Sequence, residues 1–189
     1  MIKIGILGDI GSGKSFVANS FGYPVFNADI EVSKLYKKDK KIFKKLKKKL
    51  PKYISSFPIN KNEITKAILS NKVNLKKIIT IVHLEIRKIL KLFLKKNRDK
   101  KVIILDIPLL LENKINNKDD ILVFVDSKKI EIEKRLKKRL NFNRKLINKF
   151  KKIQFSSSYK KRRSNFIIKN NFKKKSLNKS IKKILNEIL

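Results

Sequence analysis

The sequence predicts a three-layer α/β fold built around a five-stranded parallel sheet. Five short apolar runs recur along the 189 residues. The segments between them carry apolar residues at three- and four-residue spacing, which is the pattern of helices alternating with strands. A glycine-rich loop directly follows the first apolar run and opens a helical pattern, so the chain begins as strand, turn and helix.

The apolar runs give the strands in order. The first strand is predicted at Ile2–Leu7, and a helix follows it from Lys14 to about Phe21. The other four strands are predicted at Pro24–Asn27, Val102–Asp106, Ile121–Asp126 and Phe166–Lys169.

The stretch from about residue 31 to residue 98 has Lys-rich faces and apolar residues at helical spacing, interrupted at Pro51 and Pro58. Because roughly 65 residues exceed the dozen or more that one crossover needs, we expect a helical insertion in the sheet domain. Two further helices are predicted at Ile130–Lys152, which is densely basic, and at Ser176–Leu189.

The composition excludes several classes of protein. The chain has no cysteine and one histidine, which rules out a disulfide framework, a thiolate nucleophile and a Cys-based metal site. The best apolar run, Val102–Leu111, is broken by Asp106 and Pro108 and falls short of the roughly 20 residues of a membrane span. The N-terminus lacks the apolar core of a signal peptide. We therefore expect a soluble, cytoplasmic protein with no membrane partner.

The charge is strongly positive. Lys and Arg number 51 against 15 Asp and Glu, a formal net charge of +36, and such a surface attracts polyanions whatever their sequence. The basic residues are mostly Lys, spread over the whole chain, and no nucleic-acid-binding motif accompanies them. This pattern favours a compositional origin over a specific nucleic-acid partner, and it leaves non-specific polyanion binding open.

Residues 8–15, Gly-Asp-Ile-Gly-Ser-Gly-Lys-Ser, match the phosphate-loop pattern G-x-x-x-x-G-K-[ST] between a predicted strand and a predicted helix. Glycines allow the backbone N–H groups to converge on phosphate oxygens. Lys14 would place its charge on the β- and γ-phosphates, and Ser15 would give its hydroxyl to Mg²⁺. The predicted ATP-binding residues are Gly11, Ser12, Gly13, Lys14, Ser15 and Phe16, the last through its backbone N–H.

This loop, the P-loop, predicts nucleotide binding in a P-loop NTPase fold without selecting a reaction. GTPases, ATPase motors and small-molecule kinases all contain it. The short chain, the helical insertion and a basic helix before the last strand favour a kinase, and no N-K-x-D base-reading motif is present. The predicted organisation is a core of residues 1–30, 99–134 and 160–189, an acceptor-binding insertion of residues 31–98 and a lid of residues 135–159.

Several further segments resemble one family, the dephospho-CoA kinases. The resemblance rests on the P-loop, Phe26-Asn27-Ala28-Asp29, Val82-His83, the segment D-I-P-L-L-L-E at residues 106–112, Arg135-x-x-x-Arg139, Gln154 and the segment 165–170. It implies transfer of the ATP γ-phosphate to the ribose 3′-hydroxyl of dephospho-CoA, with ATP and Mg²⁺ as cofactors.

The chain departs from the family pattern at four positions. The first Asp of the family's D-A-D segment is Asn27, the Pro after the His is Leu84, the Thr after the P-loop Ser is Phe16, and an Asp near the last strand is Asn165. None of these removes a residue that the chemistry requires, although Asn27 removes one carboxylate.

The resemblance makes Asp29 the catalytic carboxylate. It follows the second strand at the sheet edge where open α/β folds bind ligands, and a carboxylate there can orient a hydroxyl and accept its proton. The structural alternative is an N-cap of the following helix.

Asp106 ends the third strand, where P-loop proteins often reach Mg²⁺ directly or through water. With Ser15 it forms the predicted metal site; the alternative is an ordinary turn residue. Glu112 belongs to the same family-like segment and either supports the site or contacts the acceptor.

The lid prediction rests on arginines, because guanidinium groups bind two phosphate oxygens at once. The resemblance places three arginines, Arg135, Arg139 and Arg144, over the triphosphate. Arg135 and Arg139 are spaced to share one helix face, and Arg139 is predicted as a catalytic residue together with Lys14. In so basic a chain each could instead be solvated. His83 is predicted to be structural or to contact the acceptor.

Two other functions remain open from the sequence. One is a P-loop kinase for another acceptor, such as a nucleoside monophosphate. The other is a basic nucleic-acid-associated protein whose P-loop is secondary, which predicts tight binding that weakens steeply with salt.

Overall fold

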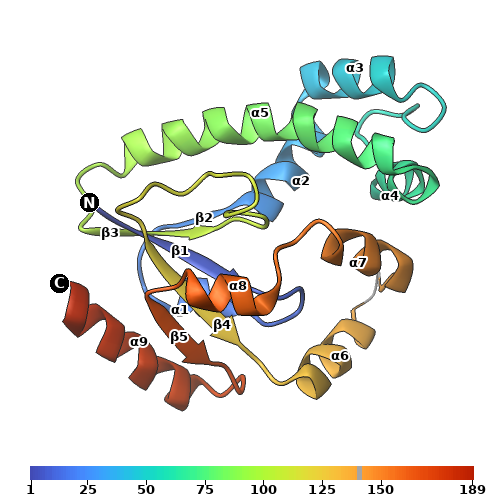
Figure 1. Cartoon of the computed structure of the whole chain (residues 1–189). Coiled ribbons are helices and arrows are strands. Elements are labelled where there is room, and N and C mark those ends of the chain that lie inside the picture. The colour runs from blue at the N-terminus through green and yellow to red at the C-terminus, as the bar shows by residue number, and fades with distance from the viewer. Residues whose placement is uncertain (140–141) are drawn as a thin grey trace. The chain divides into compact units, whose positions relative to one another are not determined.

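The computed structural model describes residues 1–139 and 142–189 (Figure 1). The chain forms two compact units. The first, which we call the sheet unit, contains residues 1–27, 97–143 and 150–189. The second, the helical unit, contains residues 28–96 and 144–149. The roles predicted for the insertion and the lid stay predictions, because this division concerns packing and not ligands.

The sheet unit contains a five-stranded parallel sheet in the order β2-β3-β1-β4-β5, which confirms the predicted α/β fold. The strands are β1 (Ile2–Gly8), β2 (Val25–Asn27), β3 (Val102–Asp106), β4 (Ile121–Asp126) and β5 (Phe166–Lys169). The central strands β1, β3 and β4 are mostly buried and mostly apolar, as expected for a parallel sheet covered on both faces; their charged residues are Lys3 and the strand-end residues Asp106 and Asp126.

Two helices, α1 (Lys14–Ser20) and α9 (Lys174–Ile188), cover one face of this sheet. Their apolar side chains and those of the strands form the core: Ile4, Ile6, Val17, Ala18, Phe21, Val102, Ile104, Val123, Val125, Ile168, Leu177, Ile181 and Ile184. On the other face Leu110 and Leu122 close over Gly5, where a Cβ would meet them at 2.6 and 2.9 Å. The helix α8 (Ser157–Arg162) also contacts β1.

The helical unit is organised around α5 (Lys72–Lys96), a helix of 25 residues. Its buried apolar residues recur every three or four positions at Leu75, Ile78, Val82, Ile86 and Leu90, so they form one stripe. Three helices contact α5: α2 (Ala28–Lys38), α3 (Lys40–Lys49) and α4 (Lys61–Ser70). Asp39 is the N-cap residue of lysine-rich α3, and its carboxylate accepts from two backbone N–H groups of the first turn.

The prediction of one helix over Ile130–Lys152 was wrong. The segment Ile130–Lys152 forms two helices, α6 (Lys129–Lys137) and α7 (Arg144–Lys151), rather than one; residues 140–141 lie outside the described residues. Residues 144–149 pack with the helical unit, where the Lys149 Nζ donates to the carbonyls of Ile68 and Leu69 at 2.6 and 2.7 Å. These carbonyls end α4, so the lysine satisfies groups that the helix leaves unpaired.

Among the described residues, none of the helices combines the length and the apolar character that a bilayer crossing requires.

Candidate functional site

The P-loop joins β1 to α1 at the carboxyl edge of the sheet. Gly13 is the N-cap residue of α1, with φ of 89° and ψ of 24°, a left-handed conformation that glycine adopts without steric cost. The helix therefore begins at Lys14, and the first-turn N–H groups have no partners within the helix. Such N–H groups, together with the helix dipole, attract phosphate. Phe16 packs its ring against the sheet core, so its side chain leaves the loop clear.

Lys14 is folded over this loop. Its Nζ donates to the carbonyl oxygens of Gly8 and Asp9 at 3.1 and 2.9 Å. The ammonium group is thus held above the loop backbone, where P-loop lysines reach phosphate oxygens.

Asp106, Ser15 and Asn27 come together beside the P-loop. Asp106 is 3% exposed, and its carboxylate accepts hydrogen bonds from the Ser15 hydroxyl and from the Asn27 Nδ2, the latter at 2.7 Å. Burial raises the pKa of Asp106, while the Ser15 hydrogen bond and the positive charge of Lys14 oppose that rise. Asn27 and Asp106 are register partners at the ends of β2 and β3. The amide therefore donates to Asp106 where a second carboxylate would repel it.

The oxygens of Ser15 and Asp106 are the donors that Mg²⁺ prefers. Groups of three or more His, Cys, Asp or Glu side chains that could hold a metal are absent within residues 1–139 and 142–189. Two protein oxygens are too few to form a complete ligand set for a metal ion. They fit Mg²⁺ bound to a nucleotide, since this ion usually keeps waters and phosphate oxygens as its other ligands.

The arginines predicted for the lid occupy three different environments. The guanidinium of Arg135, in α6, lies over the ring of Phe172, 4.1 Å from its centroid. Arg139 lies beyond the last residue of α6, so the prediction that Arg135 and Arg139 share one helix face was wrong. The backbone turns there, and the Arg139 N–H donates to the carbonyl of Leu136. Arg144 is the first residue of α7 and belongs to the helical unit.

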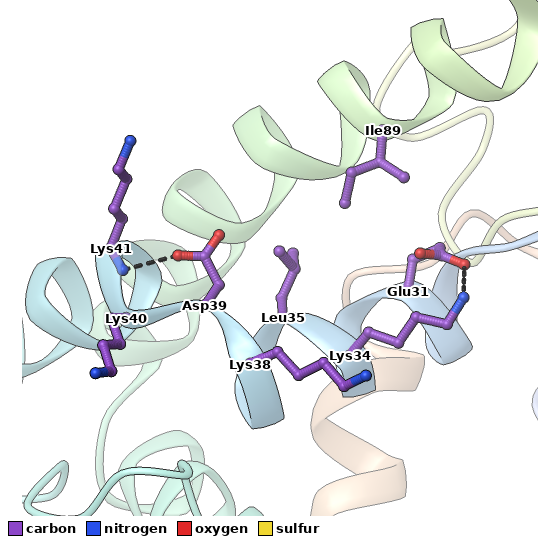
Figure 2. Close-up of a pocket in the computed structure, with 8 residues that line it drawn as sticks. All are labelled: Glu31, Lys34, Leu35, Lys38, Asp39, Lys40, Lys41 and Ile89. Carbon is purple, nitrogen blue, oxygen red and sulfur yellow. Dashed lines mark hydrogen bonds and ion pairs between the residues drawn. The ribbon is translucent and has the colours of Figure 1, made fainter.

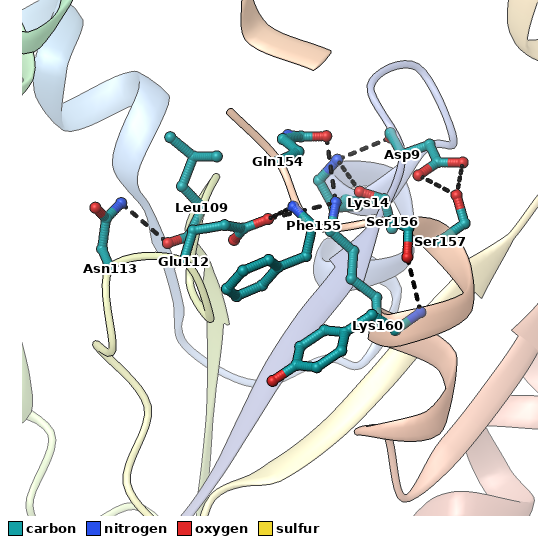
Figure 3. Close-up of polar contacts among 12 residues, drawn as sticks. Asp9, Lys14, Leu109, Glu112, Asn113, Gln154, Phe155, Ser156, Ser157 and Lys160 are labelled. Carbon is teal, nitrogen blue, oxygen red and sulfur yellow. Dashed lines mark hydrogen bonds and ion pairs between the residues drawn. The ribbon is translucent and has the colours of Figure 1, made fainter. Parts of the chain in front are cut away.

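Glu112 joins three segments of the sheet unit (Figure 3). Its Oε1 accepts from the Phe155 N–H at 2.8 Å and lies 3.7 Å from the Nζ of Lys160. The Lys160 side chain is 4% exposed, and its Nζ also donates to the Gln154 Oε1 at 3.2 Å. Lys160, Gln154 and Glu112 line one small cavity with Lys14. Glu112 thus anchors the end of the predicted lid beside the P-loop.

A cavity of about 300 Å³ lies beside the P-loop. Asp9 and Ile10 of the loop line it together with α6 and the segment 151–157. Within the wall, the carboxylate of Asp9 accepts from the Ser157 hydroxyl at 2.7 and 2.8 Å, which ties the loop to the start of α8.

Asp29 and His83 belong to the helical unit. Asp29 is exposed in the first turn of α2, not at a position before the helix, so it does not serve as the N-cap. The chain runs from β2 into α2 without a loop, which places Asp29 two residues after Asn27. His83 is half-buried in α5, where burial and then the charge of Arg87 lower its pKa.

The helical unit also has an open cavity of about 600 Å³ with Leu35 and Ile89 in its wall (Figure 2). Its rim is charged, and Lys34 is paired with Glu31 at 2.7 Å. None of the predicted site residues lines it. Each residue turns an α-helix by about 100°. Asp29 and Glu31 are two positions apart in α2, so they lie on different sides of this helix.

Sequence reasoning assigned no individual role to Asn170, although the segment 165–170 is among those that resemble the family. Asn170 directly follows β5, and its Nδ2 donates to the Ser12 carbonyl at 2.9 Å. Its place after a parallel strand was the available signal, since ligands bind at the carboxyl edge of such sheets.

Comparison with known proteins identifies the family. A family model described as Dephospho-CoA kinase matches residues 2–176. The Dephospho-CoA kinase of Wolbachia pipientis wMel is 34% identical over 190 residues, which cover 98% of this chain and 97% of the relative.

Two solved structures share the fold. A crystal structure of TT1252 from Thermus thermophilus superposes with a TM-score of 0.80 at 26% identity, covering 100% of this chain and 98% of that one. The Dephospho-CoA kinase from Campylobacter jejuni has a TM-score of 0.63 at 21% identity, covers 98% and 96% of the two chains, and supports the fold alone. With a family match over residues 2–176 and relatives aligned along nearly their full length, this chain belongs to the dephospho-CoA kinase family and is a kinase that uses ATP.

Proposed function

We propose that this chain transfers the γ-phosphate of ATP to the ribose 3′-hydroxyl of dephospho-CoA, giving coenzyme A and ADP. The observation that carries the proposal is the grouping of Lys14 and Ser15, at the start of α1, with Asp106 at the end of β3, in a chain whose family is that of dephospho-CoA kinases. The grouping supplies a cation, backbone N–H groups and two oxygen ligands at one end of a parallel sheet.

Nucleotide binding is assigned to the P-loop. The N–H groups of Gly11 and of Gly13 to Phe16 would bind the phosphates, whereas the Ser12 N–H donates to the Asp9 carbonyl at 3.1 Å. Lys14 would exchange its two loop carbonyls for phosphate oxygens. Ser15 and Asp106 would hold Mg²⁺, which when bound neutralises charge on the phosphates. The hydrogen bond from Asn27 keeps the Asp106 carboxylate turned toward Ser15.

Asp29 is assigned as the general base. As the 3′-oxygen forms its bond to the γ-phosphorus, the hydroxyl proton passes to the Asp29 carboxylate and the bond from phosphorus to the β-phosphate oxygen breaks, releasing ADP. The exposed position in the first turn of α2 lets the side chain meet a substrate. The helical unit, with His83, would receive the rest of the acceptor.

The lid arginines would stabilise the charge that spreads over the transferring phosphoryl group. Arg139 and Arg144 are exposed and flank the segment between α6 and α7. Movement of the proposed lid would carry both side chains with it. Closure of such a lid excludes water and limits hydrolysis of ATP. Glu112 is assigned a supporting role, because its carboxylate is engaged by Phe155 and Lys160.

The direct test is to incubate the protein with Mg-ATP and dephospho-CoA and to detect coenzyme A by mass. A parallel panel of nucleoside monophosphates, read by ADP release, separates this activity from that of another P-loop kinase. Phosphorylation of a nucleoside monophosphate without formation of coenzyme A would contradict the proposed acceptor.

A further inference from the structure

Asn170 is buried, and both polar atoms of its side-chain amide are hydrogen-bonded. It is 5% exposed and directly follows β5. Its backbone N–H donates to the Asp126 carbonyl at 2.7 Å, its Nδ2 donates to the Ser12 carbonyl at 2.9 Å, and its Oδ1 accepts from the Phe172 N–H at 2.9 Å. The side chain therefore connects the end of β5 with a P-loop residue 158 positions away.

The bond to Ser12 fixes one peptide plane of the P-loop. The Ser12 carbonyl accepts from Asn170 and also from the Ser127 hydroxyl at 2.8 Å. In a trans peptide the C=O and the N–H point in opposite directions. Both donors directly follow strands, Ser127 after β4 and Asn170 after β5, so the Ser12 carbonyl is directed at these strand ends and the Gly13 N–H is turned away from them.

The side-chain oxygen of Asn170 fixes the turn that contains Phe172. This residue has φ of 62°, a conformation that non-glycine residues seldom adopt, and its N–H is held by the Asn170 Oδ1. The ring lies beside Gly13, where a Cβ would meet it at 2.7 Å, and beneath the Arg135 guanidinium at 4.1 Å. One amide thus positions both a P-loop peptide and the support of a lid arginine.

We propose that Asn170 is a positioning residue for the triphosphate: it aims the Gly13 N–H and holds Phe172 under Arg135. The inference rests on the proposed nucleotide site. Aspartate has the same shape, but an ionised carboxylate has no donor for the Ser12 carbonyl and would face it with like partial charge. Asn170→Asp is therefore the most informative substitution.

The test compares Asn170→Asp and Asn170→Ala with Asn165→Asp. Asn165 lies just before β5, and its Oδ1 accepts from the Leu122 N–H at 2.8 Å, a role that a carboxylate oxygen can keep. Binding of ADP and of inorganic triphosphate is measured by calorimetry without acceptor. The KM for ATP and the KM for the acceptor are measured by turnover.

We expect both Asn170 variants to weaken ADP and triphosphate binding at least about tenfold, the effect of one buried hydrogen bond left unmade. The KM for ATP should rise in parallel, while the acceptor KM and all constants of Asn165→Asp stay within about twofold. A merely structural role would lower thermal stability without this split between the two substrates.

Parent-like ADP binding by folded Asn170→Asp would overturn the inference and leave the proposed function standing. If the parent binds neither ADP nor triphosphate, both fail. If the Asn170 variants do not fold, Ser127→Ala removes the second donor to the Ser12 carbonyl from a partly exposed position; a rise of about threefold in the ADP dissociation constant supports the inference, and an unchanged constant contradicts it.

Discussion

Replacing Gly13 by alanine should cost the native state about 2–6 kcal/mol. The backbone φ of 89° accounts for about 1–3 kcal/mol, because a residue with a Cβ is strained there. The new Cβ would also lie 2.6 Å from the Asn170 Nδ2 and 2.7 Å from a ring carbon of Phe172. Displacing the Asn170 amide leaves a buried donor without its acceptor, which costs a further free energy of about 1–3 kcal/mol.

Gly22→Ala is the matched control. Gly22 has a similar φ of 76°, but a Cβ there meets nothing within 4 Å, so this substitution contributes the backbone strain alone. Urea unfolding of the two variants and the parent gives the two free energies of unfolding, and calorimetry gives ADP affinity. We expect Gly13→Ala to lose about 1–3 kcal/mol more than Gly22→Ala and to lose ADP binding, which Gly22→Ala retains. Equal losses of stability with parent-like ADP binding by both variants would refute the contact argument.

Further predictions concern the reacting groups and their neighbours. Asp29→Asn should lower kcat by about 10²-fold or more with ADP affinity near that of the parent; a variant that keeps most of its turnover would remove Asp29 as the base. Arg139→Ala should lower kcat by about 10²-fold, and a loss of less than about threefold would identify a surface arginine. Asn27→Asp places a carboxylate where the Asn27 Nδ2 now lies 2.7 Å from the Asp106 Oδ2. The melting temperature of this variant should fall, and millimolar Mg²⁺ should raise it by more than it raises that of the parent. An equal response to Mg²⁺ would argue against a metal site there. Because burial and a neighbouring arginine lower the pKa of His83 in the folded state, the unfolded chain takes up a proton first as the pH falls below 6.5, and stability decreases through that range. His83→Gln should weaken this acid sensitivity in urea unfolding at pH 7.5 and 5.5, and an unchanged pH dependence would contradict it.

The strands were predictable because their signal is local. The apolar runs of β3, β4 and β5 end at the predicted residues, and β1 extends by one residue to Gly8. A fully buried parallel strand needs apolar side chains on both faces, so its sequence is a continuous apolar run. The P-loop was equally visible, because glycines and a lysine at fixed spacing are required by the backbone geometry itself.

The helices were predicted less accurately where polar residues decide their ends. The basic stretch after β4 has helical periodicity throughout, yet it forms α6 and α7 with a break between them. In a segment so rich in lysine the apolar spacing does not mark an end, and α7 buries none of its residues fully. The short helix α8 was missed, although Ser156 caps it through a hydrogen bond to the Tyr159 N–H.

The sequence by itself determined the α/β class, the P-loop and the carboxylates that follow the strands, since each depends on residues that are neighbours in the chain. Only the tertiary structure decided which groups those residues meet. Asn27 donates to Asp106 across 79 positions, and Asn170 to Ser12 across 158. These pairs exist because a parallel sheet brings strand ends from distant parts of the chain to one edge. A side chain at such an edge has its chemistry set by a partner that no local pattern can reveal.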